Sequence, residues 1–115
     1  MSKRIPALLI ADILTSIAKI ESYTSGLIYE SFLADRRTVE AVERNFEIIG
    51  EAANQLSKDF QQNNSHIPWH SVVSFRNRLI HGYFGVDYEI IWYVITVDLI
   101  DLKKQFERLQ AGLDS

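Results

Sequence analysis

The residues best suited to chemistry lie in one short stretch, Arg76-Asn77-Arg78-Leu79-Ile80-His81-Gly82-Tyr83. An arginine guanidinium binds phosphate through a fork of donors, and a histidine imidazole can carry a proton near neutral pH. No Asp or Glu occurs between Asp59 and Asp87, and that interval holds all three histidines of the chain. In a chain of net charge -3, this stretch is a local basic region, which favours a site for a phosphate-containing ligand.

The composition predicts one ordinary globular domain over residues 1–115, with 47% hydrophobic residues. The chain has no cysteine, which excludes disulfides and thiolate metal sites and is typical of a reducing cytoplasm. No apolar run approaches the roughly 18 residues of a membrane span, so we expect a cytoplasmic protein without a membrane contact. The acidic balance argues against non-specific coating of nucleic acid, so any such contact should be local.

Apolar spacing and sparse Gly and Pro predict helices throughout. A first helix is expected over residues 6–24, with Gly26 just beyond it, because Leu9, Ile13, Ile17 and Ile20 recur at helical spacing. A short turn should follow, in which Tyr29, Phe32 and Leu33 cover the core. Asp35 is the predicted N-cap of a second helix. Its apolar seam comprises Val39, Val42, Phe46, Ile49, Ala53, Leu56 and Phe60, and residues 61–65 are expected to form a loop.

A third helix is predicted to begin at about Trp69, after Pro68, and to end at Gly82. Asp87 is the expected N-cap of a fourth helix. No strand pattern competes, so the predicted fold is all-α, an antiparallel bundle of four main helices with one short extra turn. The apolar seam of the fourth helix comprises Ile91, Ile95, Leu99, Leu102, Phe106 and Leu109.

The third helix divides into two faces at about 100° per residue. Val72, Phe75 and Leu79 fall on one arc, which should face the core. The other arc carries a polar stripe, in which Arg76 flanks Asn77. A stripe of His, Ser, Asn and Arg without a carboxylate favours a polar pocket at a subunit interface over a simple solvated face. The stripe itself comprises His70, Ser74, Asn77 and His81.

Plainer interpretations of these residues stay open. A polar helix face is most often simply solvated, and His81 could be an ordinary histidine at a helix end, where the helix dipole favours its charged form and Arg76 opposes it. His66 and His70 have the i, i+4 spacing of metal ligands, but no acidic or cysteine ligand follows nearby, so no metal site is predicted. Glycine-rich phosphate loops and Ser or Cys nucleophile motifs are absent from the sequence.

Arg76, Asn77, His81 and Tyr83 resemble the Arg-x4-His-x-Tyr motif of the HEPN ribonuclease toxins, and most closely the HepT-like branch. The flanking sequence is similar to that branch as well, and the resemblance covers essentially the whole chain. The matching flanks are Ile49-Gly50-Glu51-Ala52, Ile67-Pro68-Trp69 and Tyr83-Phe84-Gly85-Val86-Asp87.

The resemblance implies a homodimeric HEPN-like bundle that acts as a metal-independent endoribonuclease without a cofactor. It also implies a partner, a minimal nucleotidyltransferase antitoxin that can transfer AMP to the motif tyrosine, here Tyr83, in a complex that can be larger than a heterodimer. RNA can be cut without metal because its own 2′-OH attacks the adjacent phosphate.

In that reading His81 is the general acid–base and Arg76 holds the phosphate, while Asn77 orients the histidine or donates to a phosphate oxygen. We expect further substrate contacts from Arg78, Ser74 and His70. One chain offers one such histidine, whereas the reaction uses both an acid and a base, so a twofold interface that joins two polar stripes would complete the site.

Two other functions fit part of the sequence. A non-catalytic module could use the polar stripe to bind a nucleotide or the nucleotidyltransferase, with Arg76 as a phosphate anchor, and the net acidity suits it. A purely structural dimerisation bundle would explain the apolar seams but not the polar stripe. Replacing His81 distinguishes the binding module from an enzyme, because the substitution would abolish RNA cleavage in an enzyme and a binding module has no cleavage to lose.

Overall fold

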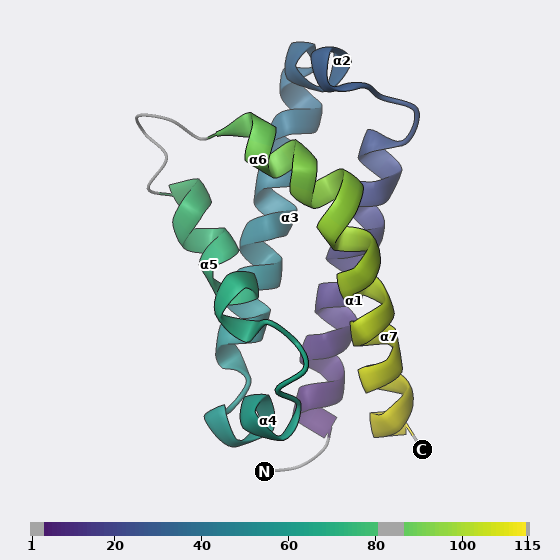
Figure 1. Cartoon of the computed structure of the whole chain (residues 1–115). Coiled ribbons are helices and arrows are strands. Elements are labelled where there is room, and N and C mark those ends of the chain that lie inside the picture. The colour runs from purple at the N-terminus through teal and green to yellow at the C-terminus, as the bar shows by residue number, and fades with distance from the viewer. Residues whose placement is uncertain (1–3, 81–86, 115) are drawn as a thin grey trace.

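The computed structural model describes the backbone of residues 4–80 and 87–114 and the side chains of residues 5–75 and 87–113. Within these ranges the chain forms helices and turns and no strand, which confirms the predicted all-helical class (Figure 1). The elements are α1 (Arg4–Thr24), α2 (Tyr29–Ala34), α3 (Arg36–Gln55), α4 (Lys58–Asn63), α5 (Trp69–Ile80), α6 (Tyr88–Tyr93), the π-helical turn η2 (Val94–Asp98) and α7 (Leu99–Asp114).

The long helices share one apolar core. α3 packs against α1 on one side and against α5 on the other, and α7 packs against α1. The short helices lie at opposite ends of the molecule in Figure 1, with α2 beside α6 at the upper end and α4 at the lower end. Ile13 and Ile17 of α1, Val42 of α3 and Phe106 of α7 are all at most 1% exposed.

α1 follows the predicted pattern and begins two residues earlier than predicted, at Arg4. Its inward positions Ile13, Ile17 and Ile20 are fully buried. The helix ends at Thr24, whose hydroxyl donates to the Ile20 carbonyl at 2.8 Å. Gly26 then adopts a φ of 77°, in the left-handed region that side chains disfavour, so glycine suits the turn that leads into α2.

The turn before α3 is helical, and one of its predicted core residues is not in the core. Phe32 of α2 is fully buried as expected, but Leu33 is 41% exposed because neighbouring positions of a helix point in different directions. The predicted N-cap of α3 is confirmed: Asp35 Oδ1 accepts from the Thr38 N–H at 3.2 Å, and Asp35 Oδ2 accepts from the Thr38 hydroxyl at 2.8 Å.

The predicted C-terminal end of the second helix is wrong. α3 stops at Gln55, Leu56 becomes extended, and Ser57 caps a separate helix, α4, by accepting from the Phe60 N–H at 3.1 Å. Phe60 and residues 61–63 therefore belong to α4, whereas the prediction placed Phe60 in the second helix and residues 61–63 in a loop. The side-chain amide of Gln61 donates to the carbonyls of Ala53 and Leu56, which satisfies acceptors that the end of α3 exposes.

The fourth predicted helix is confirmed, with an unexpected turn inside it. Asp87 Oδ1 accepts from the N–H groups of Glu89 and Ile90 at 3.1 and 3.4 Å, as an N-cap should. Between α6 and α7 the chain forms the π turn η2, where the Thr96 hydroxyl donates to the Trp92 carbonyl at 2.8 Å. Such bonds compete with the helical ladder and accompany local irregularity. The predicted seam residues Ile91, Ile95, Leu99, Leu102 and Phe106 are buried, and Leu109 is partly buried.

Candidate functional site

The helix that carries the predicted site is α5, and its backbone continues through Arg76, Asn77 and Arg78 to Ile80. The side chains of these three residues lie outside the described residues, as do His81 and Tyr83 and the predicted helix end at Gly82. The catalytic roles and the modification site therefore stay predictions. What the structure does describe is how the two flanks of this segment are held.

One aromatic contact and one buried aliphatic side chain hold α5 on the core side. The Phe75 ring, 8% exposed, meets the Phe46 ring of α3 edge to face, with centroids 5.2 Å apart and planes at 72°. Val72, one turn earlier, is fully buried. Asn77 follows Phe75 by two residues, which places its Cα about 160° away around the helix axis, on the face opposite the core. The division of α5 into an apolar and a polar face is therefore confirmed as far as Phe75.

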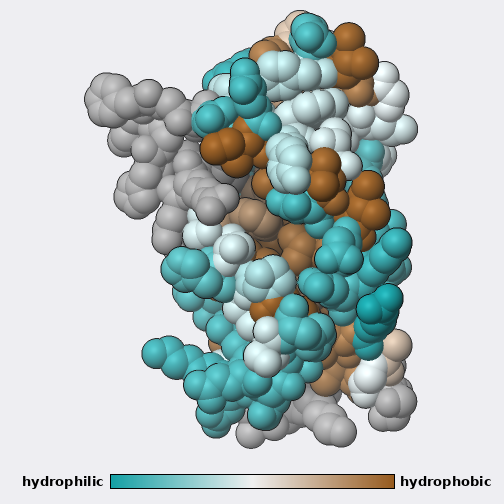
Figure 2. Space-filling view, viewed as in Figure 1, coloured by the Kyte–Doolittle hydropathy of each residue, from teal (hydrophilic) through white to brown (hydrophobic). Residues whose placement is uncertain are grey.

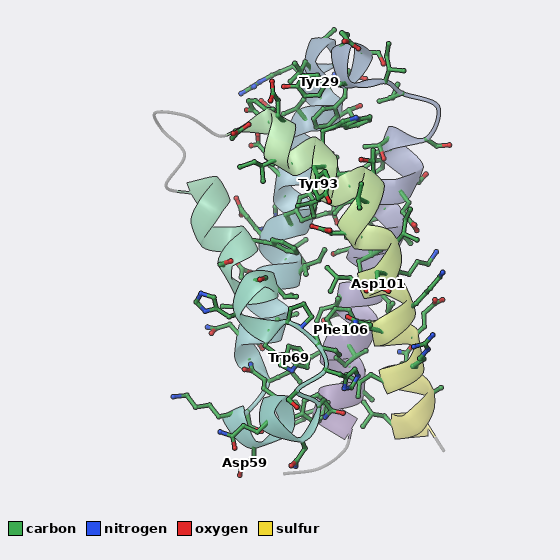
Figure 3. All side chains as sticks on the ribbon, viewed as in Figure 1. Tyr29, Asp59, Trp69, Tyr93, Asp101 and Phe106 are labelled. Atoms are coloured by element: carbon green, nitrogen blue, oxygen red, sulfur yellow. The ribbon has the colours of Figure 1, made fainter. Side chains whose placement is uncertain are left out.

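The beginning of α5 is anchored against α4 and α7. Figure 3 shows Trp69 and Phe106 turned toward one another between the helices, and their ring centroids are 5.7 Å apart. The Trp69 ring also contacts Phe60 of α4 at 6.2 Å, and its indole N–H donates to the Asn64 carbonyl at 3.0 Å. Since two ring contacts and one hydrogen bond hold Trp69, the N-terminal turn of α5 is anchored against α4 and α7.

Two predicted substrate contacts lie among the described residues. Ser74 is only partly exposed, and its hydroxyl donates to the Ser71 carbonyl at 2.8 Å, so it retains acceptor capacity but has used its proton within the helix. His70 is exposed and lines an open hollow of about 300 Å³ with Asn54, Lys58 and Gln61. Backbone geometry puts His70 and Ser74 on the same face of α5, as the sequence predicted.

The two histidines with metal-like spacing do not share a site. His66 precedes α5 and lines a different hollow, of about 420 Å³, with Asn64 and Arg108. Among the side chains of residues 5–75 and 87–113, no group of three or more His, Cys, Asp and Glu is arranged to hold a metal ion. In the same part of the chain, no helix is long and apolar enough to cross a membrane.

The other flank of the segment, where α6 begins, is tied to α3. The Tyr88 hydroxyl donates to Glu43 Oε1 at 3.0 Å, a contact between residues 45 apart in the chain. Burial raises the pKa of Tyr88, the bond to Glu43 adds to the shift, and nearby Arg36 opposes it. Tyr88 in turn raises the pKa of Arg36. No local pattern along the chain predicts this contact, because it joins two helices whose relative rotation is set by the core.

α5 and α6, the described helices before and after residues 81–86, therefore both contact α3. α5 is held by Phe46 and Phe75, and α6 by Glu43 and Tyr88. Glu43 and Phe46 are one turn apart on α3, so the two anchors use neighbouring positions of the same helix. The described helices on both sides of the motif are thus held on one common helix.

Comparison with known proteins places this scaffold among ribonucleases. A family model described as ribonuclease HepT-like matches residues 13–109. A protein of Thermococcus cleftensis named "Probable ribonuclease HepT" is 41% identical over 99 residues, which cover 86% of this chain and 90% of the relative. A "Putative RNase" of Methanocaldococcus jannaschii is 37% identical over 107 residues, covering 93% and 98% of the two chains.

A third relative, a "Putative RNase" of Caldanaerobacter subterraneus, is 40% identical over 84 residues, covering 73% of this chain and 75% of its own. No solved structure matches the chain. The matched residues 13–109 include the whole segment 76–83 and both of the anchors that flank it.

Proposed function

Because the chain belongs to the ribonuclease HepT-like family, we propose that it is an endoribonuclease that cleaves RNA without a metal ion. The observation that carries the proposal is the family match over residues 13–109, which includes the Arg-x4-His-x-Tyr motif. The reaction needs no outside nucleophile, because the ribose 2′-OH attacks the adjacent phosphate and the 5′-oxygen leaves. The protein has only to move protons and to stabilise the charge on the phosphorus centre.

The motif residues divide these tasks. Arg76 binds the phosphate and stabilises the negative charge of the transition state through its forked guanidinium. His81 transfers the protons, an effect typically worth about 10²–10⁴-fold in rate. Asn77 orients the histidine or donates to a phosphate oxygen, and Arg78, Ser74 and His70 extend the contact along the RNA strand.

One His81 cannot stand on both sides of the phosphorus. Removing a proton from the 2′-OH and giving one to the leaving oxygen are tasks at opposite ends of an in-line displacement. A second copy of the chain supplies the second histidine in a composite site on a twofold axis. The active form is therefore a homodimer.

The biological role that fits this enzyme is that of a toxin in a toxin–antitoxin pair. Its partner is a minimal nucleotidyltransferase, which neutralises it by transferring AMP from ATP to the Tyr83 hydroxyl, with pyrophosphate as the leaving group. The added phosphate brings negative charge and bulk beside the phosphate-binding residues and so blocks RNA. Incubation with that partner and ATP should add the mass of one AMP to the chain and nothing to the Tyr83→Phe variant.

The proposal is tested by expressing the protein alone in cells, beside Arg76→Ala and His81→Ala, and examining growth and total RNA. We expect arrested growth and RNA fragments with the parent protein and neither effect with the two variants. Arg108→Ala and His66→Ala are matched controls, because they remove the same residue types from a hollow outside the motif. Cleavage that survives both motif substitutions would refute the assigned roles.

A second candidate function is a module that binds a nucleotide or the nucleotidyltransferase without cutting RNA. The net charge of -3 favours it, since a polyanionic substrate is repelled by an acidic protein. Intact RNA and normal growth with a soluble, folded parent protein would select this function. In that case Arg76→Ala should weaken nucleotide binding, measured by calorimetry with ATP.

A further inference from the structure

Two adjoining hollows, of about 300 and 370 Å³, lie where α4 meets the beginning of α5. Both are lined by Lys58, Gln61 and Trp69, and we call the pair the α4–α5 hollows. Asn54 and His70 line the smaller one, and no Asp or Glu lines either. Figure 2 shows hydrophilic surface over α4, at the lower end of the molecule. The size and polarity suit a small polar group as a ligand.

The side chain of Gln61 holds a fixed hydrogen-bond acceptor at the α4–α5 hollows. Its amide nitrogen donates to the Ala53 carbonyl at 3.0 Å and to the Leu56 carbonyl at 3.3 Å. Only the NH₂ group can satisfy two carbonyls, so these bonds determine which end of the amide is the oxygen. The Gln61 Oε1 accepts no hydrogen bond from the described residues and is accessible to solvent.

An oxygen that can only accept a hydrogen bond selects a ligand that donates one. Among the RNA bases, adenine, cytosine and guanine carry an exocyclic amino group, whereas uracil has a carbonyl where cytosine has its amino group. Proteins read such edges on unpaired bases of single-stranded RNA. Because α3 holds the Gln61 amide in place before a ligand arrives, little side-chain freedom is lost on binding.

The neighbouring groups suit the remainder of a nucleotide. Lys58 is exposed and forms no ion pair with the described residues, so its ammonium is available to a phosphate. His70 is exposed as well, and an imidazole ring can stack on a base. Leu56 and Trp69, 4% and 7% exposed, give the smaller hollow an apolar floor.

The α4–α5 hollows are in line with the motif along α5. His70 and Asn77 are seven residues apart, which puts their Cα atoms on the same face and about 10.5 Å apart along the helix axis. At about 3.4 Å per nucleotide of a stacked strand, this distance corresponds to about three nucleotides. α5 carries no carboxylate, and Figure 3 shows Asp59 of α4 at the lower end of the molecule, turned away from Trp69.

We propose that the α4–α5 hollows are a nucleotide subsite for the RNA strand. Gln61 Oε1 accepts from the exocyclic amino group of an unpaired base, and Lys58 pairs with a phosphate of the same strand. The subsite rests on the proposed ribonuclease function and deepens it by naming the class of base that the enzyme reads. It disfavours uridine at a position about three nucleotides from the cleaved bond.

The base preference is tested with strands that contain one cleavable bond. Each strand is a deoxyuridine oligonucleotide with a single ribonucleotide, of each base in turn, because DNA lacks the 2′-OH that attacks the phosphate. One deoxycytidine then replaces a deoxyuridine at successive positions on either side. We expect kcat/KM to rise about 2–10-fold when the deoxycytidine is about three nucleotides from the ribonucleotide on one side. A flat profile overturns the proposal.

Substitutions then assign the preference to Gln61. Gln61→Met keeps the length of the side chain and removes the acceptor, so the ratio of the rates on the deoxycytidine and deoxyuridine strands should fall to about one. A loss of stability affects both strands equally and leaves this ratio unchanged. Asn54→Trp fills the smaller hollow from an exposed position and should have the same effect, whereas Gln110→Met on α7 should keep the ratio. A ratio that survives the first two substitutions contradicts the assignment.

The phosphate contact is tested by fluorescence anisotropy with an all-deoxy strand, which is not cleaved. Lys58→Ala should reduce the slope of log affinity against log salt concentration by about 0.7, and Lys58→Arg should retain the slope. Lys19→Ala is the matched control, because Lys19 is exposed on α1, across α3 from α5, and its loss changes the net charge equally. An unchanged slope in Lys58→Ala would rule out the phosphate contact.

The binding and cleavage assays together separate this inference from the proposed function. A parent protein that binds the deoxycytidine strand through Gln61 and Lys58 but cuts no RNA would refute the proposed activity and leave the subsite standing. Cleavage without a base preference, unaffected by Lys58→Ala, would leave the ribonuclease standing and overturn the subsite. Free CMP that binds as tightly as the strand, in a Lys58-dependent way, would assign the hollows to a mononucleotide and also overturn it.

Discussion

Replacing Phe75 by leucine tests whether the core contact before Arg76 positions the functional segment. Phe75 packs edge to face on Phe46 at 5.2 Å and is the last described side chain before the motif. Leucine keeps the site apolar but removes the ring contact. We expect α5 to remain helical and to lose the constraint that sets its rotation on α3.

The size of the effect follows from the contact. Complete removal of a buried Phe side chain costs about 3–5 kcal/mol, and an edge-to-face aromatic pair contributes about 0.5–1.5 kcal/mol beyond its buried area. Phe75→Leu retains much of the volume, so we expect a loss of about 1–2 kcal/mol in the free energy of unfolding. For a chain of this size that lowers Tm by about 4–8 °C.

The stability assay is urea unfolding of the parent, Phe75→Leu, Phe46→Leu and the double variant. Because the two rings contact each other, the double-mutant cycle should give a coupling of about 0.5–1.5 kcal/mol. Ile17→Val is the control for a core loss remote from α5, at about 0.5–1.5 kcal/mol. Ile17 is 1% exposed and lies on α1.

Ribonuclease assays distinguish a loss of positioning at the motif from a loss of stability alone. A displacement of about 1 Å at a catalytic group can cost about 100-fold in rate, so Phe75→Leu should lose at least about 10-fold in kcat/KM while still folded. Ile17→Val, with a similar stability loss, should keep its activity. A Phe75→Leu enzyme whose activity falls only with its folded fraction, or a coupling near zero, would refute the reasoning.

Three further predictions concern the caps and the inter-helix bond. Asp87→Ala should lower the free energy of unfolding by about 1 kcal/mol in urea melts, whereas Asp87→Asn should retain most of it because Asn also caps. Tyr88→Phe should lower the free energy of unfolding by about 0.5–1.5 kcal/mol, because it removes the hydrogen bond to Glu43. Glu43→Gln should lower it by less, because the amide oxygen still accepts, and an equal loss in both variants would contradict this explanation. The Thr38 hydroxyl and, to a smaller extent, the Thr38 N–H lower the pKa of Asp35 in the folded protein. The contribution of the Asp35 carboxylate to the free energy of unfolding is therefore present above the unfolded pKa of about 3.9, and it is lost as the pH falls through the folded pKa. The stability gap between parent and Asp35→Ala should therefore narrow in urea melts from about pH 6 to pH 3, and a constant gap would contradict the assignment.

Local signals in the sequence were sufficient for most of the elements. The caps at Asp35 and Asp87 were predicted because a carboxylate that accepts from the first N–H groups of a helix needs only residues two or three positions apart. The buried positions of α1 and α7 were predicted because a 3.6-residue period selects one face. The apolar face of α5 was predicted in the same way.

The misses share a physical cause. The break after Gln55 does not interrupt the spacing of the apolar residues. Two helices differ from one long helix here only by the N-cap at Ser57 and by the hydrogen bond from the Gln61 side chain to the Ala53 carbonyl of α3. The π turn at Val94–Asp98 likewise interrupts a pattern whose buried residues still recur every three or four positions. Leu33 was predicted to be in the core but is exposed, because it directly follows Phe32 in α2 and adjacent positions of a helix point in different directions.

The sequence by itself determined the helical class, the motif and the family, because each depends on residue types at fixed spacing along the chain. The motif's side chains lie outside the described residues, so their roles rest on sequence. The tertiary structure decided what depends on the rotation of one helix against another. It joined Tyr88 to Glu43 across 45 residues, packed Phe75 on Phe46, and left four large apolar side chains of α6, η2 and α7 exposed. Helix rotation is set by the packing of the whole core, which no local pattern contains.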